Sequence, residues 1–329
     1  MKDRKSYLDL IRIIACFLVI YVHTASANVQ TPISQVFNVL SRCNVPLFFM
    51  ISGATLLGRN ESIKDIWTKR IPRIVLLIAV FGILGLLAQA NFDVRSYFKL
   101  IASNQVVYYW WYLFAYLAAL ICLPFLRAMA QNMSKDSYVY LLILNVIGAL
   151  GWTISIRLTD MPYNEFFQFP IVTEQYIFLM LMGYFIANTV TESELEKAVG
   201  KRYVYLLVIA VAVVISLLLD DNFVLNKLIA ICLFAFIRIV MKGKASTGSK
   251  ISSSLAYISS LTLGIYMIEP IITVHLRQWI DVRLTAVIPV PIVIISTLVA
   301  TATSMIVTGF GVAIIKSIPG IKKVVGYII

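Results

Sequence analysis

Charged side chains are scarce in this sequence. Asp, Glu, Lys and Arg together make up 13% of its 329 residues, whereas hydrophobic residues make up 60%. A water-soluble domain of ordinary composition has about 25% charged residues, so this composition excludes a soluble globular protein. The apolar runs are long and continuous, and they lack the alternation of apolar and polar positions that marks a transmembrane β-barrel. The composition therefore predicts an all-α, polytopic membrane protein.

Stretches rich in Pro, Gly or Ser are also lacking, so no linker between domains is expected. We expect a single integral-membrane domain over residues 1–329, with no separate soluble domain. Apolar runs of about 20 residues, the length that crosses the hydrocarbon core, predict about ten transmembrane helices. These runs cover residues 7–27, 36–57, 70–90, 106–126, 138–156, 170–190, 203–219, 223–241, 255–275 and 285–315.

Lys and Arg are unevenly distributed between the segments that join these spans. If the N-terminus is cytoplasmic, 19 of them fall in cytoplasmic segments and five in outer segments. The five outer residues are Arg95, Lys99, Arg157, Arg277 and Arg283. This excess follows the positive-inside rule and predicts cytoplasmic N- and C-termini. Topology thereby explains the formal net charge of +12, and no nucleic-acid partner is expected.

Cysteine is rare as well. The four cysteines, Cys16, Cys43, Cys122 and Cys232, all fall inside predicted spans. No pair of them has the spacing of metal ligands, and cysteines in apolar helices are usually small core residues. We therefore expect structural cysteines and no metal site.

Histidine occurs only twice, and His23 shares the first predicted span with Arg12. Eleven steps of about 100° bring the two side chains to one helix face, about 16 Å apart along the axis. An ionisable group costs about 2.5–3.5 kcal/mol or more in hydrocarbon, so two on one stripe predict a polar site inside the membrane domain. Asp9 lies one turn before Arg12 and can pair with it.

Two interpretations of this stripe remain open. Asp9 and Arg12 can form an interfacial ion pair whose side chains reach the membrane surface, with His23 as a packing residue. Alternatively, the stripe carries chemistry. A neutral imidazole is suited to removing a proton from a hydroxyl that attacks an acyl carbonyl, and Arg is suited to a phosphate or a developing oxyanion.

Lys69, Arg70 and Arg73 form a basic segment where the third predicted span begins. Anchoring under the positive-inside rule explains this segment without any function. The functional interpretation is a cytoplasmic clamp for a polyanionic ligand such as the phosphates of coenzyme A.

Two acidic residues also lie inside predicted spans. Glu269 precedes the helix-breaking Pro270 in the ninth span, and Glu174 lies near the outer end of the sixth. For both, a structural ion pair and a catalytic role remain open.

Taken in order, these segments resemble the acyltransferase-3 family of multispanning membrane acyltransferases. The resemblance rests on five motifs: YLDLIRIIACFLVIYVH with its R-x10-H spacing, VPLFFMISG, KRIPRI, WWYLFAYLAALICLP and GIYMIEP. Family residues match at Arg12, His23, Arg70 and Arg73. The resemblance implies transfer of an acyl group, commonly acetyl, from cytoplasmic acetyl-CoA to a hydroxyl of an extracytoplasmic or lipid-linked glycan.

The chain departs from the family pattern at two positions. Tyr109 and Glu269 stand where the family often has histidine. Glutamate can still accept a proton or hold a histidine, but it reverses the local charge. These departures bear on the acceptor and the donor more than on the fold.

The leading hypothesis is a bacterial plasma-membrane O-acyltransferase. Arg12, Lys69, Arg70 and Arg73 are expected to bind acetyl-CoA or another acyl-CoA as the donor, without a metal. The expected partners are membrane lipids and a glycan or lipid-linked saccharide acceptor.

In this hypothesis His23 is the general base, and Glu269 or Glu174 orients it or balances its charge. Two alternatives remain. One is a transporter, flippase or exporter of a sugar, a lipid-linked glycan or an amino acid, in which the intramembrane charges form a substrate or proton path. The other is a scaffolding subunit of a polysaccharide synthase that has lost its chemistry.

Overall fold

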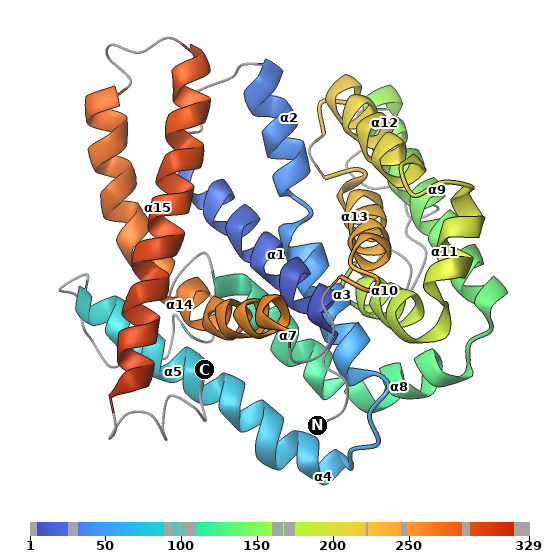
Figure 1. Ribbon diagram of the computed structural model, residues 1–329, viewed down its shortest axis with the longest axis horizontal. Helices are drawn as coiled ribbons and strands as arrows, with labels where there is room; N and C mark the ends of the chain where they lie inside the picture. The colour runs from blue at the N-terminus through green and yellow to red at the C-terminus, as the bar shows by residue number, and fades with distance from the viewer. Residues whose placement is uncertain are drawn as a thin grey trace. The chain divides into compact units, whose positions relative to one another are not determined.

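The computed structural model describes residues 5–25, 32–88, 95, 97, 101, 110–159, 167, 175–221, 223–244, 249–284 and 290–318 (Figure 1). These residues form α-helices and two five-residue π-helical stretches, with no β-strand among them. The all-α class expected from the composition is therefore confirmed for the described part of the chain.

The helices follow one another through short connections. Their bounds are α1 (Ser6–Thr24), α2 (Pro32–Ser41), α3 (Asn44–Leu56), α4 (Ile63–Asp65), η1 (Ile66–Arg70), α5 (Ile71–Ala88), α7 (Trp111–Ile121), α8 (Leu123–Asn132), α9 (Lys135–Thr159), α10 (Gln175–Tyr184), η4 (Phe185–Thr189), α11 (Glu192–Val199), α12 (Val204–Leu218), α13 (Asn226–Val240), α14 (Lys250–Leu284) and α15 (Val290–Ser317).

Five segments within the described residues are long and apolar enough to cross a membrane. They are Ser6–Thr24, Pro32–Leu56, Lys135–Thr159, Lys250–Pro270 and Ile294–Ser317. Two bent helix pairs, α7 with α8 and α11 with α12, raise the number to seven if each pair is one span. The chain is thus a multi-pass membrane protein, whereas ten spans and cytoplasmic termini stay predictions.

The bend between α7 and α8 has a clear cause in the sequence. The two helices meet at 68°, although the sequence predicted one continuous span over 106–126. Pro124 has no N–H to donate, and its ring clashes with the carbonyl four residues earlier, so a straight helix cannot pass through it. Cys122 lies at this break and is exposed, unlike the other three cysteines. The prediction of a core position is therefore wrong for Cys122.

The second bent pair is defined by its caps. Thr191 and Glu194 form a capping box at the start of α11, in which each side chain satisfies a backbone N–H of the other residue. The helix ends at Gly200, whose φ of 75° is a left-handed conformation that glycine adopts without strain. The chain then turns by 59° into α12.

The described chain divides into two compact units, and we treat each by itself. Unit 1 comprises residues 1–18, 30–59 and 125–259, and unit 2 comprises residues 19–29, 60–124 and 260–329. Helices α1 and α14 each contribute one end to both units. The single domain expected from the sequence stays a prediction.

In unit 1, α3 and α10 cross at the closest contact that two helices can make. Gly53 lies directly against the backbone of Met180, and Gly183 lies directly against the backbone of Met50. A Cβ atom at either glycine would overlap the facing carbonyl oxygen. Small residues that let backbones approach are the usual device for packing helices in membranes. These two reciprocal glycines therefore fix where α3 and α10 cross.

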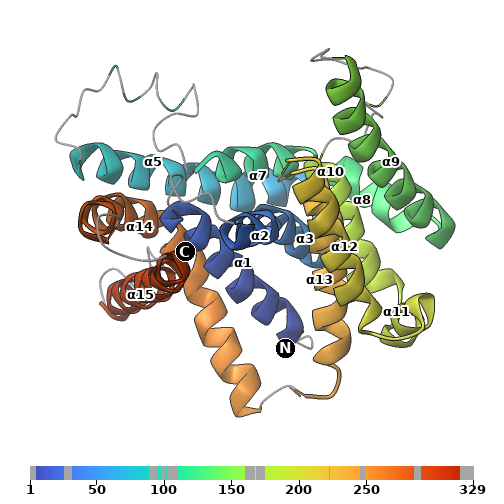
Figure 2. The ribbon, with the colours of Figure 1, turned by 90° about the horizontal axis from the view of Figure 1, so that it is seen from above.

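Helices α12 and α13 form a tight hairpin in the same unit and lie side by side (Figure 2). The sequence predicted this hairpin from the polar break at residues 220–222. Asp220 takes a left-handed φ of 44°, which Asp tolerates better than most residues. The hairpin prediction is confirmed.

Unit 2 packs α5 against α7. Trp110, at the start of α7, is fully buried, and its ring meets the ring of Phe81 edge to face at 6.5 Å between centroids. This geometry is favourable for aromatic pairs beyond the area that they bury.

The glycine crossing gives a direct test of the fold. We expect Gly53→Ala and Gly183→Ala each to lower the free energy of unfolding by about 1–3 kcal/mol or more, because the facing backbone cannot move aside. Thermal unfolding of the purified protein in detergent measures this change.

Gly311→Ala is the matched control, because a Cβ there meets open space within α15. We expect it to be neutral or stabilising by roughly 0.5–1 kcal/mol. Equal melting temperatures for Gly53→Ala and Gly311→Ala would contradict the proposed crossing.

Candidate active site

The structure brings together two of the side chains that the sequence singled out. His23 lies near the C-terminal end of α1 and Glu269 within α14, and both belong to unit 2. The Nδ1 atom of His23 is 2.7 Å from Oε2 of Glu269. The His23 side chain is 8% exposed and the Glu269 side chain is 0% exposed. A buried carboxylate is costly without a hydrogen-bond partner, and the imidazole supplies one.

This contact assigns different tasks to the two ring nitrogens of His23. When the proton is on Nδ1, that N–H donates to the Glu269 carboxylate and Nε2 carries the basic lone pair. A carboxylate behind a histidine fixes the ring orientation and stabilises the imidazolium formed when Nε2 takes a proton. The arrangement can therefore perform general-base chemistry.

Buried hydroxyl groups lie close to this pair. The hydroxyl of Thr24, the residue after His23, is 2.7 Å from the hydroxyl of Thr301 on α15. Thr301, Ser304 and Thr308 are all buried on α15. The sequence analysis missed them, although Thr297, Thr301, Ser304 and Thr308 recur at helical spacing in an otherwise apolar segment. That recurrence is the signal that identifies a polar helix face.

Arg12 lies in unit 1, closer to the N-terminal end of α1. Its Nη1 atom donates to Oγ of Ser259 on α14 at 2.8 Å and is 3.5 Å from Oδ1 of Asp9. The predicted pairing of Asp9 with Arg12 is present. The Arg12 side chain is 30% exposed, so its guanidinium is held in place but accessible.

Three contacts between α1 and α14 keep nearly the same offset in the chain. Ser6 meets Ser252, Arg12 meets Ser259, and His23 meets Glu269, at separations of 246, 247 and 246 residues. Because partner numbers rise together, the two helices run parallel and in register. Arg12 and His23 both face α14, which agrees with their predicted place on one helix face.

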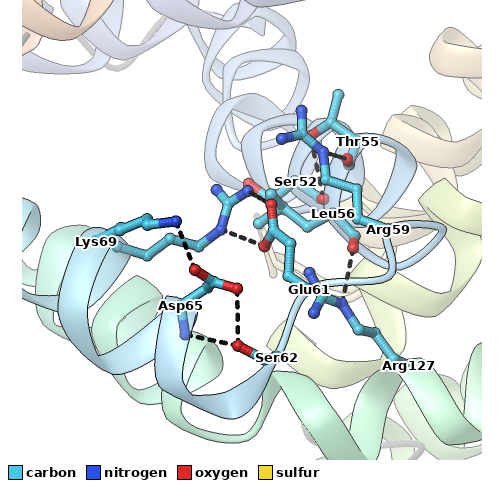
Figure 3. A network of polar contacts seen from close by, with 10 residues as sticks. Ser52, Thr55, Leu56, Arg59, Glu61, Ser62, Asp65, Lys69 and Arg127 are labelled. Atoms are coloured by element: carbon cyan, nitrogen blue, oxygen red, sulfur yellow. Dashed lines mark hydrogen bonds and ion pairs between the residues drawn. The ribbon is translucent and has the colours of Figure 1, made fainter.

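The basic segment after α3 is balanced by acids that the sequence analysis did not pair with it (Figure 3). Arg70 donates through Nε and Nη2 to the two carboxylate oxygens of Glu61, with 2.7 Å between Nε and Oε2. Lys69 pairs with Asp65 at 2.5 Å, one helical turn earlier. Hydrogen bonds from Lys69 and Ser62 hold the pKa of Asp65 at about 2, so this carboxylate is ionised at neutral pH.

The local backbone sets the positions of these side chains. Ile66–Arg70 is a π-helical stretch, a wider turn that is rare and is frequent at functional sites. Glu61 lies nine residues before Arg70, beyond the reach of any helical spacing rule. No signal in the sequence could have identified this partner.

Arg73 lies at the start of α5 and is partly buried. Its positive charge acts on Lys316, at the end of α15 in the same unit. The Lys316 ammonium donates to the carbonyl of Ser260 at 2.7 Å. Two cationic side chains from distant parts of the sequence are therefore close together in unit 2.

Two predicted positions lie outside the described residues. They are Glu174, predicted to support His23, and Tyr109, a departure from the family pattern. The role of Glu174 stays a prediction. Across the residues that the structure does describe, no group of three or more His, Cys, Asp or Glu side chains is arranged to hold a metal ion.

The chain was compared with known families and proteins. The model of the family Acyl_transf_3, described as an acyltransferase domain, matches residues 5–309. Neither the curated proteins nor the solved structures contained a match to this chain.

The contact between His23 and Glu269 makes a prediction that needs no assay of activity. We expect Glu269→Ala to destabilise the protein by about 1–3 kcal/mol, because the buried imidazole loses its partner. In a double-mutant cycle with His23→Ala, we expect a coupling energy of about 0.5–3 kcal/mol, measured by thermal unfolding in detergent.

Glu269→Gln is the matched variant, since the amide keeps the size of the side chain and can still accept the Nδ1 hydrogen bond. We expect it to be more stable than Glu269→Ala. Strictly additive effects of the two alanine substitutions would rule out the contact.

Proposed function

This chain belongs to the acyltransferase-3 family, and from that premise we propose that it transfers an acyl group, acetyl in the first instance, from cytoplasmic acyl-CoA to a hydroxyl of a cell-surface or lipid-linked glycan. The family match covers residues 5–309 and establishes the general class, a membrane acyltransferase. The acetyl group, the CoA donor, the glycan acceptor and a bacterial plasma membrane are our proposal.

The observation that carries the chemistry is the buried contact of 2.7 Å between His23 and Glu269. The acceptor hydroxyl attacks the thioester carbonyl, and Nε2 of His23 takes its proton as the new C–O bond forms. The tetrahedral adduct then collapses, the C–S bond breaks, and the proton passes to the departing CoA sulfur. Glu269 acts on the imidazolium between these two steps, because its carboxylate is held against Nδ1.

Arg12 has the geometry of a residue that positions an anion. Ser259 and Asp9 restrict the guanidinium, and nearly a third of its side chain stays accessible. A guanidinium keeps its charge at any physiological pH and binds phosphate or an oxyanion through several N–H groups at once. We assign it to the donor, as the residue nearest the cytoplasmic end of the α1 stripe.

The three cations of the basic segment differ in how readily they can bind CoA phosphates. The ion pair of Lys69 with Asp65 is highly exposed, since 73% of the Lys69 side chain is accessible, and such pairs contribute little. Lys69 can therefore exchange Asp65 for a phosphate. Arg70 is held more firmly by the two-pronged contact with Glu61. Arg73 has the ammonium of Lys316 close by, which adds positive charge for a polyanion.

Transfer of radiolabelled acetyl from acetyl-CoA to membranes, with purified protein, tests the chemistry. We expect His23→Ala and His23→Gln to lower the rate by about 10²–10⁴-fold, because neither side chain can take the proton. Both variants should express and fold in normal amounts, as judged by gel filtration in detergent. Full activity in His23→Ala would overturn the mechanism.

Donor binding is tested separately by thermal shift with acetyl-CoA. We expect the wild-type protein to be stabilised, and Arg12→Ala and Arg73→Ala to need about tenfold more acetyl-CoA for the same shift. Arg73→Lys, which keeps the charge, should lie between them and the wild type. A wild-type protein that does not respond to acetyl-CoA would favour a transporter or flippase instead.

A further inference from the structure

A pocket of about 440 Å³ lies within unit 1, between α9 and the hairpin that joins α12 to α13. Its volume falls within the range of about 300–1,000 Å³ that is usual for small-molecule sites. The wall contains two aromatic side chains, Trp152 and Phe223, and four polar ones, Asn145, Thr153, Asp221 and Lys227. This lining differs from the apolar helices around it and needs an explanation.

The polar groups are set in fixed positions. Oδ1 of Asp221 accepts a hydrogen bond of 2.8 Å from the backbone N–H of Phe223, and Oδ2 accepts one of 3.2 Å from the Thr153 hydroxyl. Asn145 is buried near the middle of α9, where an amide side chain is costly among apolar residues. The sequence therefore maintains hydrogen-bonding groups where packing alone would favour aliphatic side chains.

The aromatic groups are braced from behind. The guanidinium of Arg42 lies 4.8 Å from the centroid of the Phe223 ring, and the Asn226 amide donates to the Arg42 carbonyl at 3.4 Å. Trp152 comes from α9, on the other side of the pocket's lining. Aromatic faces are electron-rich, so they attract the slightly positive C–H groups of a ligand.

Charge narrows the class of ligand further. One carboxylate, Asp221, and one ammonium, Lys227, line the pocket, so their formal charges cancel. A phosphate would meet the Asp221 carboxylate, and a hydrocarbon chain would leave buried polar groups without partners. A compact neutral molecule with many hydroxyls and an apolar C–H face matches all of these groups, and that is the chemistry of a sugar ring.

We propose that this pocket binds one saccharide unit of the glycan acceptor. This assignment deepens the proposed function and rests on it. The orientation predicted from the positive-inside rule places the hairpin between α12 and α13 on the outer side of the membrane, where a cell-surface or lipid-linked glycan would be found.

Binding of free sugars to the purified protein in detergent tests the pocket directly. The probes are a hexose, an N-acetylhexosamine and a hexuronic acid, followed by saturation-transfer NMR and isothermal titration. We expect at least one of them to bind, and Trp152→Ala and Asp221→Asn each to weaken that binding by about tenfold or more. Trp152→Phe, which keeps an aromatic face, should bind within a few-fold of the wild type.

Two further variants separate a lost site from a damaged fold. Ala149→Leu fills the pocket without removing a polar group, and we expect it to block sugar binding. Ile147→Ala changes an exposed side chain on the same helix, and we expect binding to be unchanged. The proposal is overturned if no sugar binds, if the pocket variants bind as well as the wild type, or if a phospholipid copurifies in the pocket and competes with the sugar.

The failure of this proposal is distinguishable from the failure of the proposed function. His23→Ala should still bind the sugar, and Trp152→Ala should still respond to acetyl-CoA while its KM for the glycan acceptor rises. Acetyl transfer with no sugar binding would refute the pocket alone. Sugar binding by a protein that neither binds acetyl-CoA nor transfers acetyl would refute the acyltransferase function and leave a saccharide site.

Discussion

The buried contact between His23 and Glu269 is the constraint on which the candidate site depends. A carboxylate on α14 with no exposed surface is tolerable because an imidazole on α1 is 2.7 Å away. This contact is the last of three that join the two helices at nearly constant sequence offset. The polar groups thus define the register of the pair, and the register in turn sets which groups meet. Chemistry and helix packing use the same contacts here.

Local features of the site could be predicted from the sequence, whereas its distant partners could not. The pairing of Asp9 with Arg12 follows from helical spacing, and so does the shared face of Arg12 and His23. Helical class and the α12–α13 hairpin follow from apolar runs and a short polar break. The contact of His23 with Glu269 joins residues 246 apart, and a single sequence holds no signal for such a distance beyond the cost of burying each group. For the same reason Glu61 could not be matched to Arg70, nor Met180 to Gly53.

Differences in burial divide the charged pairs into two kinds. The ion pair of Arg238 with Glu192 is 2.9 Å long, and Arg238 is buried, so breaking it would leave a guanidinium in an apolar interior. The pair of Lys69 with Asp65 is exposed and contributes little to stability. Pairs of the first kind hold helices together. Pairs of the second kind leave their cations able to change partners, which suits the side of the protein that is proposed to bind a charged donor.

The register of α1 and α14 also limits how the length of this chain can vary. One residue inserted between Arg12 and His23 would turn every later side chain of α1 by about 100° and move it along the axis by about 1.5 Å. His23 would then face away from Glu269, whatever residues occupied the positions between. The connecting loops carry no such restriction. The identity of the intervening residues is thus open to change as long as they stay apolar and helical, while their number is not.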